Sequence, residues 1–262
     1  MLEYLVVAVA ALAVAALTLF SGFGLGTLLV PVMALFFPIE VAIAATAVVH
    51  FANNLFKIAL VGRTADWHVV AVFALPGALA ALIGASLLTL VSEVPPIATY
   101  ELVGTAHEIG PVGVVIGVVI IVFALLDILP RFQDLAFDRK YLPVGGLLSG
   151  FFGGLSGNQG ALRSAFLIKS GLDKEAYVGT AAVASTIVDV SRLLVYGLAI
   201  FTVGLADPRG DLTGLVAAAM AAAFVGSFVG SRLVKKVTLR TVQLMVGLLL
   251  IAIGTALVTG LV

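Results

Sequence analysis

Long apolar runs, separated by short polar connections, extend along almost the whole chain. A helix needs about 20 apolar residues to cross the hydrocarbon core of a bilayer. The pattern therefore predicts an all-α polytopic membrane protein. Hydropathy and breaking residues place ten apolar segments at about 3–20, 25–37, 41–62, 68–91, 110–129, 142–154, 160–171, 176–204, 212–234 and 240–262.

Three of these segments, 25–37, 142–154 and 160–171, are too short to span a bilayer comfortably. They adjoin two glycine-rich stretches, at residues 21–27 and 149–163. Short, glycine-interrupted segments at matching places in two halves of a chain point to the binding site of a transporter. We therefore expect two short helical hairpins, one in each half.

The two halves have the same layout, a glycine-broken hairpin followed by three long helices. This order predicts two repeats of about five apolar segments, residues 1–130 and 142–262, joined by a linker at 131–141. Without a gap, an offset of 134 positions pairs Gly26 with Gly160, Ala42 with Ala176, Thr46 with Thr180 and Val61 with Val195.

Basic residues indicate the orientation, since they favour cytoplasmic connections. They follow the odd-numbered segments, whereas connections after even-numbered segments hold only Arg209 and the 92–109 connection is acidic. Both termini should then face the extracytoplasmic side and the linker the cytoplasm. Five segments per half is an odd number, so the repeats are expected to be inverted, with hairpin tips meeting near the midplane. The basic residues used are Arg63, Arg131, Arg139, Lys140, Lys174, Lys235, Lys236 and Arg240.

An alternative counts each hairpin as one bent crossing and gives eight segments with parallel halves. It places Arg63 and the basic linker at 131–141 on opposite sides of the membrane, which fits the charges less well.

Composition narrows the function. Of the 262 residues, 62% are hydrophobic and 11% charged, against about 25% charged in soluble domains. A net charge of zero gives no reason to expect a nucleic-acid partner, and the absence of cysteine excludes disulfides and thiolate chemistry. No nucleotide-binding, dinucleotide or nucleophile motif occurs, so we expect no enzyme, no cofactor and no metal site. The N-terminus resembles a first membrane segment more than a cleaved signal peptide.

The hairpin tips are the predicted substrate site. Glycines let the backbone approach a ligand closely, and each returning segment starts a helix whose free N–H groups and positive dipole end favour an anion. Arg163 adds a fixed positive charge suited to an oxyanion. Close helix packing is the competing explanation for the glycines. The candidate substrate-binding residues are Gly24, Gly26, Thr27, Ser156, Gly157, Asn158, Gln159, Gly160 and Arg163.

Two polar stripes at helical spacing mark the third segment of each half and are predicted to line the pathway. Ionisable groups inside the membrane are functional candidates, and Asp189 and Arg192 should pair with each other or across the bundle. The competing readings are a structural ion pair for these two, interfacial placement for Lys57 and a packing role for His50. The stripes contain Thr46, His50, Asn53, Asn54 and Lys57, and Ser185, Asp189, Arg192 and Tyr196.

Small residues also recur four apart, at Gly226 and Gly230 and at Ser227 and Ser231. This spacing is typical of helix-packing faces in membranes. Such a face can lie inside the subunit or support a homodimer.

These glycine patterns resemble the sulfite exporter TauE/SafE family of membrane permeases. The first copy runs from Gly22 to Pro31 and is followed by the alanine-threonine pair ending at Thr46; the second runs from Ser156 to Ala165 and is followed by Gly179-Thr180. The second copy departs from the family pattern, with Asn158-Gln159 in place of glycines and Ala165 where proline is common. The resemblance covers nearly the whole chain.

The resemblance implies transport of sulfite, a sulfonate or a related sulfur-containing anion across the cytoplasmic membrane, with proton coupling as a further possibility. Asp189 is the first candidate for that coupling. Two other hypotheses stay open: a cation or proton-linked carrier centred on Asp189, and a non-transporting membrane scaffold. The expected partners are a small anion and the lipid bilayer.

Overall fold

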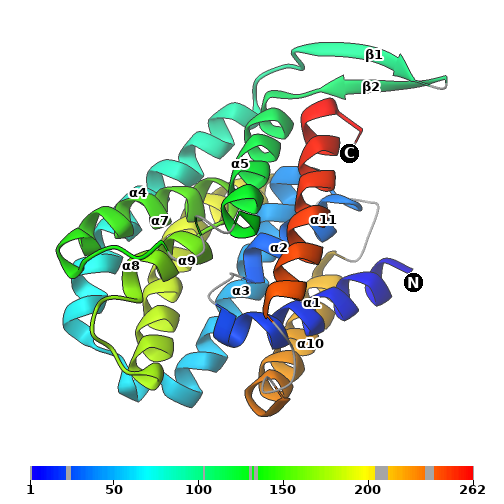
Figure 1. Cartoon of the computed structure of the whole chain (residues 1–262). Coiled ribbons are helices and arrows are strands. Elements are labelled where there is room, and N and C mark those ends of the chain that lie inside the picture. Colours follow the sequence, from blue (N-terminus) through cyan, green and yellow to red (C-terminus); the bar gives the residue numbers. More distant parts are fainter. Residues whose placement is uncertain are drawn as a thin grey trace.

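The structure, a computed structural model, describes residues 2–21, 25–102, 104–129, 132, 135–203, 212–233 and 239–261. Within these residues it contains ten α-helices and one β-hairpin, which confirms the predicted all-α membrane architecture (Figure 1).

The first half begins with a long helix and a short one, followed by two helices of more than 20 residues. A β-hairpin, which the sequence pattern did not predict, separates these from the last helix of this half. The elements are α1 (Leu2–Ser21), α2 (Leu25–Ala34), α3 (Ile39–Val61), the 3-10 turn η1 (Gly62–Thr64), α4 (Trp67–Ser92), β1 (Ala98–Leu102), β2 (Thr105–Ile109) and α5 (Pro111–Ile128).

The second half repeats this order of helices without a hairpin among its described residues. Its elements are the 3-10 turn η2 (Arg139–Tyr141), α7 (Leu142–Ser156), α8 (Gly160–Leu167), α9 (Lys174–Val203), α10 (Leu212–Leu233) and α11 (Leu239–Thr259).

Helix length divides these elements into two groups. In the described part of the chain, four stretches are long and apolar enough to cross a membrane: Ile39–Thr64, Trp67–Ser92, Lys174–Gly197 and Leu212–Gly230. In contrast, α2 has 10 residues and α8 has 8. At 1.5 Å per residue they extend about 15 Å and about 12 Å, half or less of a hydrocarbon core of about 30 Å. The segments predicted to be too short are indeed short helices.

A single glycine ends α7 and reverses the chain. Gly157 has a φ of 79°, in the left-handed region that glycine adopts without steric cost, and its N–H donates to the carbonyl of Gly153. Only Asn158 and Gln159 then separate α7 from α8. The glycine-rich stretch therefore forms a tight hairpin tip.

The β-hairpin lies where the sequence analysis expected only an acidic connection. Its antiparallel strands pair Ala98 with Ile109 and turn at Gly104, whose φ is 77°. A lone two-stranded hairpin is marginally stable in water. Here Tyr100 donates its hydroxyl to the carbonyl of Thr259, 2.7 Å away, so the hairpin is attached to the end of α11 (Figure 1).

Small residues let the helices pack with their backbones in contact. Along α7, Gly146, Gly150 and Gly154 face backbone carbonyls of α4, and a Cβ built on Gly150 would lie 2.0 Å from the carbonyl oxygen of Gly77. On α10, Gly226 and Gly230 face α1 in the same way. The predicted packing face of α10 is thus used inside the subunit.

Several of the large helix pairs recur when each first-half helix is exchanged for its second-half counterpart. Helix α1 packs on α10 as α7 packs on α4, and α3 packs on α10 as α9 packs on α4. The pairs α3 with α9 and α5 with α11 join counterparts directly, whereas α2 packs on α3 far more extensively than α8 packs on α9. The central pair, α3 and α9, carries the two polar stripes.

Candidate functional site

The tip of the second hairpin lies against the start of α2. A Cβ built on Gly26 would be 2.8 Å from the carbonyl oxygen of Gly157, and one built on Gly157 would be 3.4 Å from Cγ2 of Val30. Only glycine at position 26 permits this approach of two backbones. Gly26 and Gly157, both predicted site residues, are therefore neighbours, although they are far apart in sequence.

Asp189, in the middle of α9, is fully buried and binds two side chains of α3. Its Oδ2 lies 2.7 Å from Nδ1 of His50 and accepts a hydrogen bond of 2.9 Å from Nδ2 of Asn54. Because a carboxylate oxygen only accepts, Nδ1 of His50 must carry the hydrogen. One oxygen of Asp189 thus links the two halves of the chain.

The other oxygen of Asp189 binds Arg192 and the hairpin tip. Oδ1 accepts from Nη2 and Nε of Arg192, at 2.7 and 3.0 Å, and from Nε2 of Gln159, at 3.1 Å. Nη1 of Arg192 donates in turn to the carbonyl of Gly153, at 3.2 Å. The predicted pairing of Asp189 and Arg192 is therefore present, both within α9 and as part of a network across the bundle.

The carboxylate of Asp189 is saturated. It accepts from five N–H donors, whereas a carboxylate offers about four lone-pair sites. A cation would have to displace protein donors to reach it. The geometry gives Asp189 the role of a joint between α3, α9 and the hairpin tip.

Arg163 lies one turn into α8 and has a different environment. It is 8% exposed, its Nη1 donates to Oγ of Ser185 on α9, and its Nε has no acceptor. No carboxylate of the described residues forms an ion pair with it. A buried charge without a counter-charge is costly in a membrane. Among the described residues, Arg163 is thus a buried positive charge with no carboxylate in direct contact.

The N-terminus of α8 is also left open. Gln159 occupies the N-cap position, but its side chain does not cap the helix because it binds Asp189 instead. The first amide groups of a helix have no acceptor within that helix. The backbone of the tip is held by Ser149 of α7, whose hydroxyl donates to the carbonyl of Gln159 at 3.0 Å. The start of α8 is thus fixed in place, and no side chain of the described residues caps its positive end.

Asn158 and Ser156 form a small cluster at the same tip. Nδ2 of Asn158 donates to Oγ of Ser156, at 3.2 Å, and Ser156 donates to the carbonyl of Phe152, at 3.0 Å. Asn158 is 3% exposed, and its Oδ1 has no donor among the described residues. Gly160, the first residue of α8, is buried beside this cluster.

The other predicted residues are distributed around this centre. Asn53 accepts a hydrogen bond of 2.7 Å from Ser227 of α10 and forms no hydrogen bond with the described residues of the hairpin tip. Thr27 and Thr46 are buried, on α2 and α3. Lys57 is partly buried, within electrostatic range of Arg163 and Asp189. Gly24 lies outside the described residues.

Two residues that support the site were not predicted as part of it. Ser149 holds the tip, and Ser227 binds Asn53. A lone serine in a membrane helix gives no signal for such a role. Tyr196, which belongs to the predicted α9 stripe, donates its hydroxyl to the carbonyl of Gly154.

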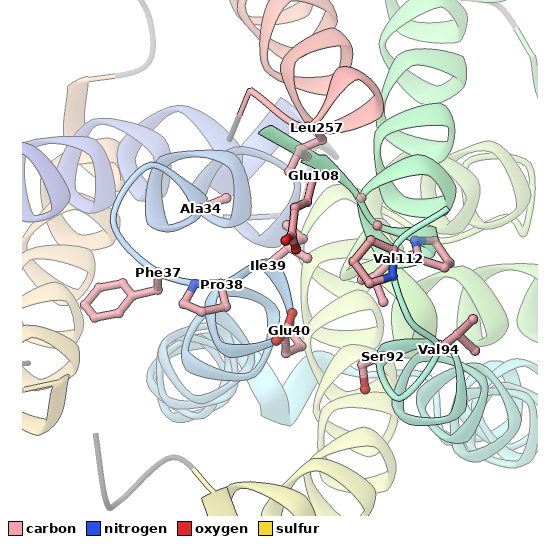
Figure 2. A pocket seen from close by; sticks show the side chains of 15 residues that line it. Ala34, Phe37, Pro38, Ile39, Glu40, Ser92, Val94, Glu108, Val112 and Leu257 are labelled. Carbon is pink, nitrogen blue, oxygen red and sulfur yellow. The ribbon is translucent and has the colours of Figure 1, made fainter. Parts of the chain in front are cut away.

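A separate pocket of about 410 Å³ opens at one end of the bundle (Figure 2). It is bounded by the end of α2, the starts of α3 and α5, and the ends of β2 and α11. Its walls are mainly apolar, and two exposed carboxylates, Glu40 and Glu108, lie along it. Its lining includes none of the predicted site residues.

The comparison with known families agrees with this architecture. The family model described as sulfite exporter TauE/SafE matches residues 7–257, which is nearly the whole chain. No curated protein matches the chain. The chain therefore belongs to the sulfite exporter TauE/SafE family and is a multi-pass membrane transporter, as the resemblance predicted.

Proposed function

We propose that the protein is a secondary transporter that carries a small sulfur-containing oxyanion, sulfite or a sulfonate, across the cytoplasmic membrane. The observation that carries this proposal is the buried guanidinium of Arg163, which forms no ion pair with any described carboxylate. The family match supports the sulfur chemistry, and the charge at the hairpin tip supports an anion.

The charges near the tip are unequal. Among the side chains hydrogen-bonded around the tip, Arg163 and Arg192 bring two positive charges, and Asp189 brings one negative charge that is already paired with Arg192. Burial of the remaining charge is costly unless an anion accompanies it. The open N-terminus of α8 points the same way, because unsatisfied N–H groups and the helix dipole favour an anion there.

A cation carrier centred on Asp189 fits this geometry less well, because five protein donors occupy the carboxylate. We assign proton coupling to the pair formed by Asp189 and His50, which joins the two halves. An Asp189→Asn variant that keeps wild-type transport and its pH dependence would remove Asp189 from this role.

We further propose that the repeats are inverted and that the hairpin tips provide the site for alternating access. The exchange symmetry of the helix pairs supports this arrangement. The end of α3, next to Arg63, lies beside the start of α9, because Thr64 donates to the carbonyl of Glu175 at 2.9 Å. We assign that basic end to the cytoplasm, and the opposite end, with the pocket and the β-hairpin, to the extracytoplasmic side.

Anion binding tests the proposal directly. We would measure the thermal stability of the purified protein in detergent against sulfite, thiosulfate, sulfate, small sulfonates, carboxylates and chloride at matched ionic strength. A ligand that binds only the folded protein raises the apparent stability. A sulfur oxyanion should stabilise the wild type and the Arg139→Met control, whose arginine is exposed, but not Arg163→Met.

Uptake into proteoliposomes separates transport from a scaffold role. A transporter should lose flux in Arg163→Met while it remains folded. Stabilisation by cations alone, or equal stabilisation of wild type and Arg163→Met by sulfur oxyanions, would contradict the proposed site.

A further inference from the structure

We infer that the site selects a singly charged oxyanion that still carries an O–H hydrogen, such as hydrogensulfite, and that Asn158 is the residue that recognises this hydrogen. This inference rests on the proposed anion site at the hairpin tip and specifies its substrate. It would distinguish hydrogensulfite from the sulfite dianion and from sulfonates, which offer only acceptors.

The orientation of the Asn158 amide follows from its neighbour. Ser156 has one hydroxyl hydrogen, which it donates to the carbonyl of Phe152. Its oxygen can then only accept from Asn158, so the group of Asn158 that faces Ser156 must be the NH₂ group. The carbonyl oxygen of Asn158 is therefore the end that is directed away from Ser156.

That oxygen is buried without a donor. Asn158 is 3% exposed, and Oδ1 has no hydrogen-bond partner among the described residues. Buried polar atoms in native proteins nearly always have a partner, and a bare acceptor is unfavourable. A ligand that brings a hydrogen to Oδ1 would satisfy it.

Asn158 and Arg163 lie on either side of the first turn of α8. With Gln159 as N-cap, Asn158 is the residue before the cap and Arg163 is the fourth residue of the helix. Here each has one unpaired buried atom, an acceptor on Asn158 and a donor on Arg163.

A ligand that spans the two must accept from Arg163 and donate to Asn158. Hydrogensulfite can do both and carries one negative charge, which matches the buried guanidinium of Arg163, with no carboxylate partner among the described residues. A fully deprotonated oxyanion would place an oxygen against Oδ1 of Asn158, where two acceptors repel. The site is thus complementary in both hydrogen bonding and charge to a protonated monoanion.

Methylphosphonate and methanesulfonate are suitable probes because they have nearly the same size and shape. At a mildly acidic pH each carries a single negative charge, but only methylphosphonate retains an O–H. We would measure the Kd of both for the full-length protein in detergent at the same pH. The wild type should bind methylphosphonate about tenfold more tightly or better, because a site built for a hydroxyl rejects the analogue that lacks it.

The variant Asn158→Leu keeps the branched shape of the side chain and removes its polar atoms, both the acceptor and the NH₂ group that binds Ser156. Its ratio of the two Kd values should fall to about one, and size-exclusion chromatography would establish that it is folded. A wild-type ratio near one would overturn the inference, because Oδ1 of Asn158 would then form no hydrogen bond with the ligand. This result needs no variant. If both anions bind equally and Arg163→Met abolishes both, only the inference on Asn158 fails; if neither binds the wild type, the anion site itself fails.

Discussion

Replacing Asp189 by asparagine tests whether this carboxylate joins α3, α9 and the hairpin tip. Asparagine has the same shape but keeps only one acceptor oxygen. If that oxygen takes the place of Oδ1, it still faces Arg192 and Gln159, and the new NH₂ group faces the donors of His50 and Asn54. The variant therefore loses two hydrogen bonds and leaves Arg192 buried without its counter-charge.

The expected cost can be worked out in two ways. Removing one partner of a buried ion pair lowers the free energy of unfolding by about 3–5 kcal/mol. Hydrogen bonds within membranes contribute about 0.6 kcal/mol each on average, so all five would contribute about 3 kcal/mol and the two lost bonds about 1.2 kcal/mol. The rest of the expected cost comes from the unpaired charge of Arg192. A loss of about 3 kcal/mol in the free energy of unfolding corresponds to a fall in Tm on the order of 10 °C.

The assay is thermal unfolding in detergent, followed by the intrinsic fluorescence of the protein, and the control is Asp173→Asn. Asp173 is exposed and accepts a hydrogen bond from the N–H of Ala176 at the start of α9. Asparagine serves equally well at such a position, so this control should leave Tm unchanged.

A double variant, Asp189→Asn with Arg192→Gln, gives the decisive comparison. Because each single change leaves a buried group without its partner, the double variant should lose less stability than the sum of the two single variants. Small and additive losses, each within about 0.5 kcal/mol as for surface substitutions, would refute the view that Asp189 joins these elements.

Two further predictions concern packing and orientation. Gly150→Ala should lower the free energy of unfolding by about 1–3 kcal/mol or more, because its Cβ would lie 2.0 Å from the carbonyl oxygen of Gly77. The control is Gly197→Ala, whose Cβ meets nothing within 4 Å. It should be neutral or stabilising in the same unfolding experiment. The chain has no cysteine, so Glu101→Cys and Arg63→Cys each introduce a single one. With a membrane-impermeant maleimide, Glu101→Cys should react in intact cells, and Arg63→Cys should react only after permeabilisation. The reverse pattern would contradict the proposed orientation.

The sequence by itself determined the class of protein and the positions of the short helices. Apolar runs specify membrane helices because every backbone polar group must be satisfied within the bilayer. The breaks near Gly26 and Gly157 were readable because glycine permits the left-handed turn and close approach that the hairpin tip requires. The spacing of Asp189 and Arg192 predicted their ion pair, since residues three apart share a helix face.

The β-hairpin escaped prediction, although its cause is local. Thr99 and Tyr100 favour strands, but two short strands gain stability here only by attachment to the end of α11. The sequence of a connection does not indicate whether the folded chain places another helix end, such as that of α11, against it.

Tertiary structure alone decided which polar residues meet. The α3 stripe reads as one continuous face, yet His50 and Asn54 bind Asp189 while Asn53 binds Ser227 on α10. Packing of α3 against two different helices divides the stripe, and helical spacing carries no information on which helix lies opposite. For the same reason only the folded chain reveals that Asp189 is saturated with donors, whereas Arg163 pairs with no carboxylate in the described part of the chain. This difference places the anion at the hairpin tip in our proposal.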